Sequence, residues 1–457
     1  MATNPDQATI QSLCELLSQI LEEAQLDDLL SSLGVQRNRS LFTPALVIWL
    51  MIFQRLHPTH TLSRAVAELK SGRLNHLFDD CKRSRSGVIS GNTGAYSKAR
   101  ERLPKEVAIS VADLIFAHCC PDGDERLLWH GYRIFAIDGT TIHLPETPEL
   151  KTAFPPGGNQ LGQATQPVVQ LVVAHDLVTG TAVTPTWGAK YGMNNTSEQG
   201  LLEVLVPKLP AHSVMVGDRN FGVFSVVYAL SQHGNPVVVR LTIDRVRRLL
   251  GEDPQDGMRK PMTWTASSHD RRSHPELPPQ ASVEGSVIVH HLYQEGSQEV
   301  IQLYLFTTLE LPSDDIIELY DRRWFLEVDL RTLKGMANLQ EMTATKVNLV
   351  EKEIVLGIAA YNLVRSIITL AAQRLELKPR NISVARVIEA IEANALTLFY
   401  ENDHEKLLSF LDDFKYYQLY RAKQKPSEPR ALKPPKRKFP LLLVPREVAR
   451  SKLHSKK

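Results

Sequence analysis

The chain has 457 residues, a length that predicts two to four domains. Hydrophobic residues make up 43% and charged residues 23%, which fits a soluble globular protein and excludes a disordered or fibrous one. The net charge of +2 is unevenly distributed. Residues 421–457 contain thirteen Lys and Arg and two Glu, a net of +11, so the preceding residues must sum to −9. We therefore expect an acidic body with a basic tail that can bind polyanions.

Cysteine usage and hydropathy indicate the compartment. The four cysteines show no Cys-x-x-Cys spacing, which argues against a structural zinc site and favours a reducing environment. The N-terminal residues show no basic segment followed by an apolar one, as a signal peptide would. The longest apolar run, 45–53, is far shorter than the ~20 residues that span a bilayer. We therefore expect a soluble, cytoplasmic protein with no membrane partner.

The first 125 residues are predicted to be all-helical. Apolar residues recur at helical spacing over 8–33, and further helices are expected at 44–56, 63–69, 93–103 and 107–118. Two roles stay open for this region. It is either a packing module or a DNA-contacting module, and Lys98, Arg100 and Arg102 on one short helix favour the second.

From Tyr132 onward the pattern indicates a mixed α/β sheet. Strands are expected at 133–138, 168–174, 181–187, 213–218 and 236–241, with helices at 196–206 and 221–233. Residues 244–300 are rich in charge, Pro and Ser, and with strands at 286–293 and 299–307 they suggest a β-rich insertion. Helices are expected from Ser313, over 351–375 and over 384–394, and the proline-containing tail from Arg421 is expected to be extended.

Two aspartates are the first candidates for chemistry. Asp138 and Asp218 each follow an apolar strand, and in an α/β sheet ligands gather at the carboxyl ends of strands. Two adjacent carboxylates repel one another unless a cation lies between them, so a divalent metal site is a natural interpretation. The alternative is that each aspartate only caps the turn after its strand.

The segment 320–334 adds a third acid. On a continuous helix at roughly 100° per residue, Tyr320, Arg323, Glu327 and Lys334 project from one face within about 60°, and Arg331 joins its edge. A carboxylate flanked by cations and a phenol suits a metal ligand beside a phosphate-binding track. The alternative is a surface helix with ordinary i,i+4 ion pairs.

These motifs resemble a known family. The pattern Tyr-x2-Arg-x3-Glu-x6-Lys at 320–334 is similar to the YREK signature of bacterial insertion-sequence transposases with a DDE triad, of the insertion-sequence-four-like type. The blocks FAIDGTTIHL and VMVGDRNFG resemble the regions of the first and second aspartates in that family. KGMANLQEMTATKVNLVEKEIVLGIAAYNLVR resembles the helices that follow, and PKRKFPLLLVPREVAR the C-terminal end. The resemblance covers about residues 85–457.

The resemblance implies an α/β fold: a ribonuclease-H-like mixed sheet interrupted by a β-rich insertion, with an all-helical N-terminal domain and a helical C-terminal region. The implied division is a helical DNA-binding domain at 1–125, the catalytic core at 126–243 and 308–400, the insertion at 244–307 and a basic region at 401–457.

It also implies a mechanism. Asp138, Asp218 and Glu327 would form a triad that binds two Mg²⁺ ions, for which Mn²⁺ can substitute, and Tyr320, Arg323 and Lys334 would contact phosphates near the transposon end. In two-metal chemistry of this kind a water first cleaves the DNA strand, and the freed 3′-hydroxyl then attacks target DNA. The implied partners are double-stranded DNA, as transposon ends and target, and a second copy of the chain in a synaptic homodimer. A bacterial, nucleoid-associated location is expected.

Two more residues are candidate DNA contacts. Some members of this family hold a flipped base against an aromatic ring, and Trp264 in the insertion is the candidate here, with a core tryptophan as the alternative. Arg219 could reach phosphate or pair with Asp218. His143, His175 and Asp176 lie near strand ends without an assigned role.

Three functions are compared. The first is a cut-and-paste transposase, in which Arg331, together with Arg323, Lys334 and Arg219, would contact DNA. The second is a non-catalytic DNA-binding regulator or transposition inhibitor on the same scaffold, against which the three intact acids argue. The third is a general ribonuclease-H-like nuclease, which would cut DNA without regard to terminal repeats.

Overall fold

The computed structural model describes most of the chain. The described residues are 19–20, 22, 26–35, 40–57, 59–74, 77, 89–119, 125–160, 162–293, 300–401, 403–419 and 444–454. Much of the helix expected at 8–33 and the larger part of the basic tail, 421–443, lie outside the described residues.

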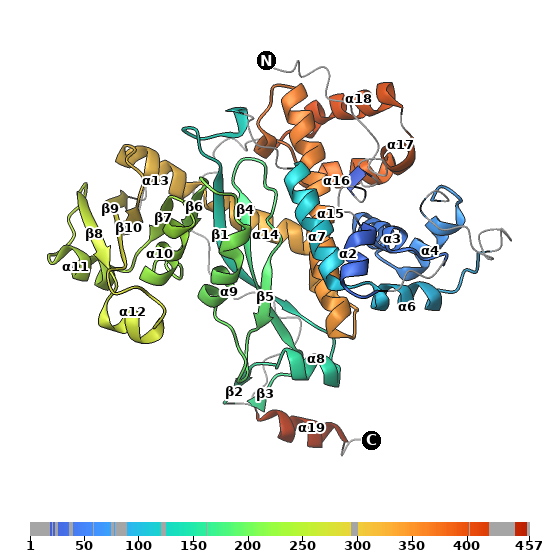
Figure 1. Ribbon diagram of the computed structural model, residues 1–457, viewed down its shortest axis with the longest axis horizontal. Coiled ribbons are helices and arrows are strands. Elements are labelled where there is room, and N and C mark those ends of the chain that lie inside the picture. Colours follow the sequence, from blue (N-terminus) through green and yellow to red (C-terminus); the bar gives the residue numbers. More distant parts are fainter. Residues whose placement is uncertain are drawn as a thin grey trace.

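A mixed sheet of eight strands forms the centre of the protein, in the order β5-β4-β1-β6-β7-β10-β9-β8 (Figure 1). Strands β1, β6 and β7 run parallel to one another, and every other neighbouring pair in this sheet is antiparallel. The strands are β1 (Ile134–His143), β4 (Val168–Asp176), β5 (Thr186–Ala189), β6 (Val214–Gly217), β7 (Val237–Arg240), β8 (Arg259–Thr265), β9 (Ser282–Tyr293) and β10 (Val300–Thr307). The expected mixed α/β sheet is therefore confirmed.

Both faces of the sheet are covered at its inner strands, which explains why β4, β6 and β7 read as continuous apolar runs rather than alternating ones. In β1, Ile134 and Ala136 belong to one hydrophobic core, and Phe135 and Ile137 belong to the other. Helices α9 (Glu198–Leu205) and α10 (Phe224–Gln232) contribute to the second core. Helices α14 (Trp324–Met336) and α15 (Val347–Arg374) contribute to the first.

The long helix α15 joins the sheet to the N-terminal helices. It packs against α7 (Lys105–Cys119) and α3 (Pro44–Leu56), as Figure 1 shows. By length and composition α15 could cross a membrane, but 83% of its most apolar window is buried inside the protein. Its hydropathy is thus accounted for by its central place in the core.

Buried charges fix the N-terminal helices on α15. The Glu353 carboxylate pairs with Arg55 at 2.8 Å and with Arg100. Lys352 donates from Nζ to the Leu103 carbonyl at 2.6 Å. Arg100 is only 6% exposed, so the expectation that it contacts DNA from α6 (Gly94–Arg102) is wrong, because it is committed to Glu353. The other two cations expected on this helix, Lys98 and Arg102, are exposed.

The inserted segment extends the central sheet. Strand β10 pairs with β7, with Leu305 opposite Arg240, and β9 and β8 follow outward. Helices α11 (Ile243–Leu250) and α12 (Ser268–Ser273) flank these strands (Figure 1). The strands expected at 286–293 and 299–307 are confirmed, whereas β8 was missed because its sequence contains Lys260 and Pro261. An edge strand tolerates proline, since one side of its backbone needs no partner.

The remaining helices lie around this core. They include α2 (Leu26–Ser32), α4 (Leu62–Lys70), α8 (Pro148–Ala153), α13 (Ser313–Asp321), α16 (Val384–Ala393), α17 (Ala395–Tyr400) and α18 (His404–Asp412), and the short 3-10 turn η6 (Pro379–Asn381). The last described helix, α19 (Arg446–His454), lies beside the small hairpin of β2 (Gly158–Asn159) and β3 (Gly162–Gln163) (Figure 1). Its Arg446 donates to the Gln163 carbonyl at 2.8 Å, so this part of the tail is not extended as expected.

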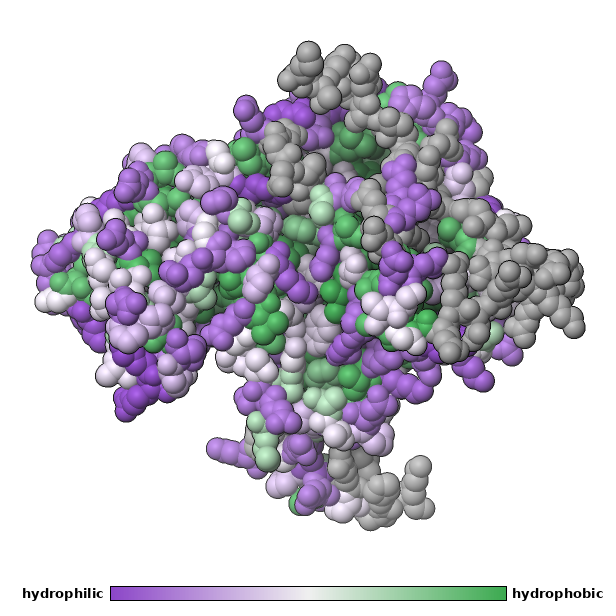
Figure 2. Space-filling view, in the orientation of Figure 1, coloured by the Kyte–Doolittle hydropathy of each residue, from purple (hydrophilic) through white to green (hydrophobic). Residues whose placement is uncertain are grey.

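The surface seen in Figure 2 is largely hydrophilic, with small apolar areas scattered between polar ones. Its outline is indented between the region of α12 and the arm formed by β2, β3 and α19.

Candidate active site

The sheet brings the two predicted aspartates together. Ile137 on β1 lies opposite Gly217 on the parallel strand β6, and Asp138 and Asp218 are the next residues on each. Asp138 does not end its strand as expected, because β1 continues to His143 in its pairing with β4. It lies where the parallel pairing with β6 stops, which still places the two carboxylates on neighbouring strands.

Backbone amides hold both carboxylates. The Gly139 amide donates to Asp138 Oδ1 at 2.7 Å, and the Asn220 amide donates to Asp218 Oδ1 at 2.8 Å. Each of these hydrogen bonds uses one oxygen of its carboxylate, so the local turns do not use up the acceptor capacity of the pair. The alternative that each aspartate caps a turn therefore accounts for one hydrogen bond of each carboxylate and leaves further acceptor capacity.

The electrostatics of Asp138 are unfavourable without a cation. Burial, followed by the charges of Asp218 and Glu198, raises the pKa of Asp138 to about 6, against the opposing effects of the Gly139 amide and Arg323. A raised carboxyl pKa means that its charged form is destabilised where it stands. A positive charge between these acids would relieve that cost.

Arg323 connects the third acid to this pair. Its guanidinium Nη1 lies 4.0 Å from Asp138 Oδ2, and its Nη2 lies 3.9 Å from Glu327 Oε1. Glu327 lies in the first turn of α14. One arginine thus lies between Asp138 and Glu327, and Asp218 is the neighbour of Asp138 on the other strand.

The helix expected across 320–334 is interrupted. α13 ends at Asp321 and α14 begins at Trp324, so Tyr320 and Glu327 belong to different helices. At the junction the hydrogen bonds change to three-residue spacing, with the Arg323 amide donating to the Tyr320 carbonyl at 3.0 Å. The single-face projection that includes Tyr320 is therefore wrong in detail, whereas Glu327, Arg331 and Lys334 still share a face of α14.

The described residues contain no group of three or more His, Cys, Asp and Glu side chains close enough to hold a metal ion. Asp138 and Asp218 are neighbours, whereas Glu327 is reached through Arg323. Carboxylate oxygens are the donors that a hard divalent cation prefers, and in this structure the positive charge between Asp138 and Glu327 is that of Arg323.

The other residues of the signature differ in exposure. Tyr320 is 8% exposed, its ring lies beside the Arg323 guanidinium, and burial raises the pKa of its hydroxyl. Lys334 is half-buried, and burial lowers the pKa of its amine. Arg331 is exposed on α14, and Arg219 is exposed next to Asp218.

Trp264 does not offer a stacking surface in this structure. It is 4% exposed and packs edge-on against Phe306, with ring centroids 5.0 Å apart, and against Phe224 at 6.0 Å. The alternative of a core tryptophan accounts for its position, and the expectation of an accessible aromatic platform at Trp264 is corrected.

Two neighbours of the aspartates were missed in the sequence. Glu198, in the first turn of α9, accepts a hydrogen bond from Asn220 Nδ2 at 2.5 Å. A side chain at Gly139 would collide with the Glu198 carboxyl group, so the glycine after Asp138 makes room for it. In the sequence Glu198 follows Ser197, which caps the helix, and an acid in the first helical turn is favoured by the helix dipole. Nothing in the sequence therefore indicated that Glu198 lies beside the two aspartates.

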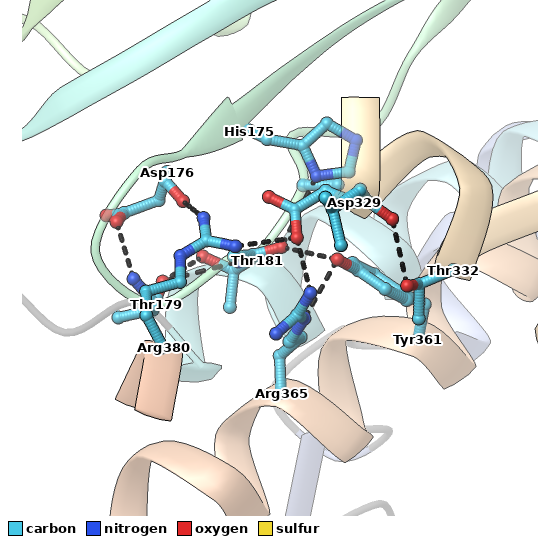
Figure 3. Close-up of polar contacts among 12 residues, drawn as sticks. His175, Asp176, Thr179, Thr181, Asp329, Thr332, Tyr361, Arg365 and Arg380 are labelled. Carbon is cyan, nitrogen blue, oxygen red and sulfur yellow. Dashed lines mark hydrogen bonds and ion pairs between the residues drawn. The ribbon is translucent and has the colours of Figure 1, made fainter. Parts of the chain in front are cut away.

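A buried ionic network surrounds Asp329, two residues after Glu327 in the sequence (Figure 3). Asp329 on α14 is fully buried and pairs with Arg365 of α15 and, at 2.6 Å, with Arg380 of η6. His175 and Asp176, which had no assigned role, belong to this network. Burial lowers the pKa of His175 to about 4, so it is neutral at physiological pH.

The comparisons with known proteins agree with this geometry. Residues 129–363 match the family described as "Transposase DDE domain". The chain is 24% identical over 279 residues to "Transposase InsG for insertion sequence element IS4" of Escherichia coli (strain K12), covering 59% of this chain and 60% of that protein. It is 28% identical over 148 residues to "Putative transposase InsZ" of the same organism, covering 31% of this chain and 46% of that protein.

The chain thus spans about half to three fifths of the length of these relatives. The matched region contains β1, β6, α14 and most of α15, and hence every residue placed around Arg323 above. The chain therefore belongs to the family of transposases with a DDE domain.

Proposed function

We propose that this protein is the transposase of an insertion sequence, which binds terminal inverted repeats and catalyses metal-dependent strand cleavage and strand transfer by a cut-and-paste route. The observation that supports it is the approach of Asp138 at β1 to Asp218 at the end of β6, with Arg323 linking Asp138 to Glu327 of α14. A regulator without catalytic activity would have no need to hold Asp138 beside other acids at an electrostatic cost.

Asp138, Asp218 and Glu327 would hold the metal, Mg²⁺ or Mn²⁺, in a two-ion site. The donor set is all oxygen, and the raised pKa of Asp138 reflects burial first and then the charge of Asp218, a cost that a cation would relieve. When bound, two divalent ions would supply the Lewis acidity that activates a water or 3′-hydroxyl and stabilises the leaving oxygen. The chain orients its carboxylates through the Gly139 and Asn220 amides.

Cations beside the acids would position the DNA backbone. Arg323, Arg331 and Lys334 follow α14 from its start to its last turn, and Tyr320 lies beside Arg323. Arginine and tyrosine at such positions suit phosphate oxygens. Arg219, exposed beside the second aspartate, would extend this track.

The strand order supports a ribonuclease-H-like core. Strands β5, β4 and β1 form an antiparallel unit, and β6 and β7 add in parallel on its other side. Residues 126–243 and 308–400 would form this core, and residues 244–307 would be the insertion that continues its sheet. The N-terminal region 1–125 would contact DNA through its remaining exposed cations.

The proposed partners are transposon ends, target DNA and a second copy of the chain. Two ends must be brought together for cut-and-paste transfer, so we expect a homodimer in the synaptic complex. The basic tail, of which 421–443 lies outside the described residues, would bind phosphate and help to keep the protein with the bacterial nucleoid.

A cleavage assay tests the proposal. Purified protein is incubated in Mg²⁺ with duplex DNA that contains the inverted repeats flanking its gene, or the same duplex with scrambled repeats. We expect cutting at the repeat boundary only, and loss of cutting in Asp138→Ala and Asp218→Ala. Glu146→Ala, which removes an exposed acid paired with Lys151, serves as the control. Equal cutting of scrambled DNA would favour a general nuclease, and cutting by Asp138→Ala would refute the proposed site.

A further inference from the structure

The helix that contains Glu327 is separated from the helix before it by a short turn. At the junction of α13 and α14, the Phe325 amide bonds the Arg322 carbonyl and the Leu326 amide bonds the Arg323 carbonyl, at 3.0 and 2.9 Å. Three-residue spacing of this kind marks a hinge-like joint in a helical segment. No side chain caps the start of α14. The position of Glu327 must therefore depend on contacts from elsewhere in the protein.

Arg380 contacts α14 on both sides of Glu327 in the sequence. Its guanidinium carbon lies 5.2 Å from the centre of the Phe325 ring, and its Nη1 donates to Asp329 Oδ1 at 2.6 Å. Phe325 and Asp329 are four residues apart, so they lie on one face of the helix. Glu327, two residues from each, points away from that face. One guanidinium thus binds the back of the turn that presents Glu327.

The same guanidinium is bonded to the end of β4. Arg380 Nε donates to the Leu177 carbonyl at 2.9 Å, and its Nη2 donates to the Asp176 carbonyl at 2.8 Å (Figure 3). The Asp176 carboxylate in turn accepts from Arg133 at 2.6 Å, directly before the strand that contains Asp138. Arg380 therefore connects the strand of the first acid to the helix of the third.

We propose that Arg380 is a positioning residue for the reaction, which sets Glu327 against the two aspartates so that they can share a metal ion. This inference rests on the proposed function, because it assigns Glu327 to that metal site. Arg380 itself does not touch the reacting atoms. The planar fork of arginine is what allows contacts to Phe325, Asp329 and two carbonyls at once, and neither lysine nor glutamine reproduces it.

The test compares the full-length Arg380→Gln variant with wild-type protein and with Arg374→Gln. The control removes a guanidinium from an exposed ion pair with Asp412, at the end of α15. Mn²⁺ binding is measured from the electron paramagnetic resonance signal of free Mn²⁺, end-DNA affinity by anisotropy, and cleavage in Mg²⁺. We expect the Mn²⁺ affinity and the cleavage rate of R380Q each to fall at least about tenfold, as is typical when a residue that supports a metal ligand is changed. The affinity of R380Q for end DNA should stay within about twofold of wild type. R374Q should match wild type.

Wild-type Mn²⁺ affinity and cleavage in folded R380Q would overturn the inference. If R380Q has no cooperative melting transition, R380K, which keeps the charge without the fork, is judged by the same two readouts. The Glu327→Gln variant distinguishes a failure of the proposed function from a failure of the positioning role of Arg380. Normal cleavage by E327Q refutes the proposed function, whereas inactive E327Q together with an unimpaired Arg380 variant refutes only the positioning role.

Discussion

Replacing Asp138 by Asn should stabilise the metal-free protein while abolishing cleavage. The pKa of Asp138 is raised from 3.8 to about 6, chiefly by burial and then by Asp218. Because the pKa of Asp138 is higher in the folded than in the unfolded protein, ionisation of Asp138 destabilises the fold. This loss of stability is absent below about pH 4 and complete above about pH 6. A difference of about two pKa units corresponds to roughly 3 kcal/mol in the free energy of unfolding.

The assay is urea unfolding in EDTA across pH. Relative to wild type, D138N should be about 3 kcal/mol more stable at pH 8 and gain about half of that at pH 5. Asp253→Asn, which breaks an exposed pair with Arg247, should change stability by less than about 0.5 kcal/mol at either pH. Added Mg²⁺ should stabilise wild type and leave D138N unchanged. A D138N variant that is no more stable than wild type at pH 8 would refute the electrostatic reasoning.

Three further outcomes follow from the described contacts. Glu353→Gln leaves the buried cations of Arg55 and Arg100 without their counter-charge. It should therefore lower the free energy of unfolding, measured by urea denaturation, by about 3–5 kcal/mol. A loss below about 1 kcal/mol would contradict the buried pairing. Trp264→Ala should cost about 3–5 kcal/mol in the same measurement, whereas an accessible stacking residue would cost little. Lys334→Gln should weaken end-DNA binding and reduce its salt slope by about one; an unchanged slope would exclude a phosphate contact.

The aspartate pair could be predicted because its signal is local. Each acid follows a short apolar strand, and the rule that ligands gather at strand ends needs no knowledge of the rest of the fold. The exact place of Asp138 could not be predicted, because β1 continues beyond it through pairing with β4, whose residues lie some thirty positions later. Long-range pairing determines where a strand stops, and local pattern does not record it.

The region around Glu327 shows a second limit. Periodicity suggested one helix from Tyr320 to Lys334, whereas the structure interrupts it at Arg322 and Arg323. Both residues keep right-handed helical backbone angles, so no glycine or proline announces the break. The contacts of Arg380 also escape sequence reasoning, since they join three segments that are far apart in the chain.

Trp264 illustrates how burial decides between two interpretations of one residue. Its sequence context, with charges and prolines on either side, gave no reason to choose between an accessible ring and a core ring. Strand β8 turns it toward Phe224 and Phe306 once the insertion joins the central sheet. Composition alone could not reveal that joining, because it depends on β10 pairing with β7.

The rate of Mg²⁺-dependent cleavage by Glu327→Gln tests the central claim most directly, because Glu327 is the acid that must join a pair formed elsewhere in the chain. Glu318→Gln is the matched control, since Glu318 is an exposed glutamate on α13 that pairs with Arg322. With DNA affinity unchanged, E327Q should lose at least about a hundredfold in rate, more than an outer-shell change costs, and E318Q should retain wild-type activity. Equal rates for E327Q and wild type would contradict the three-acid site.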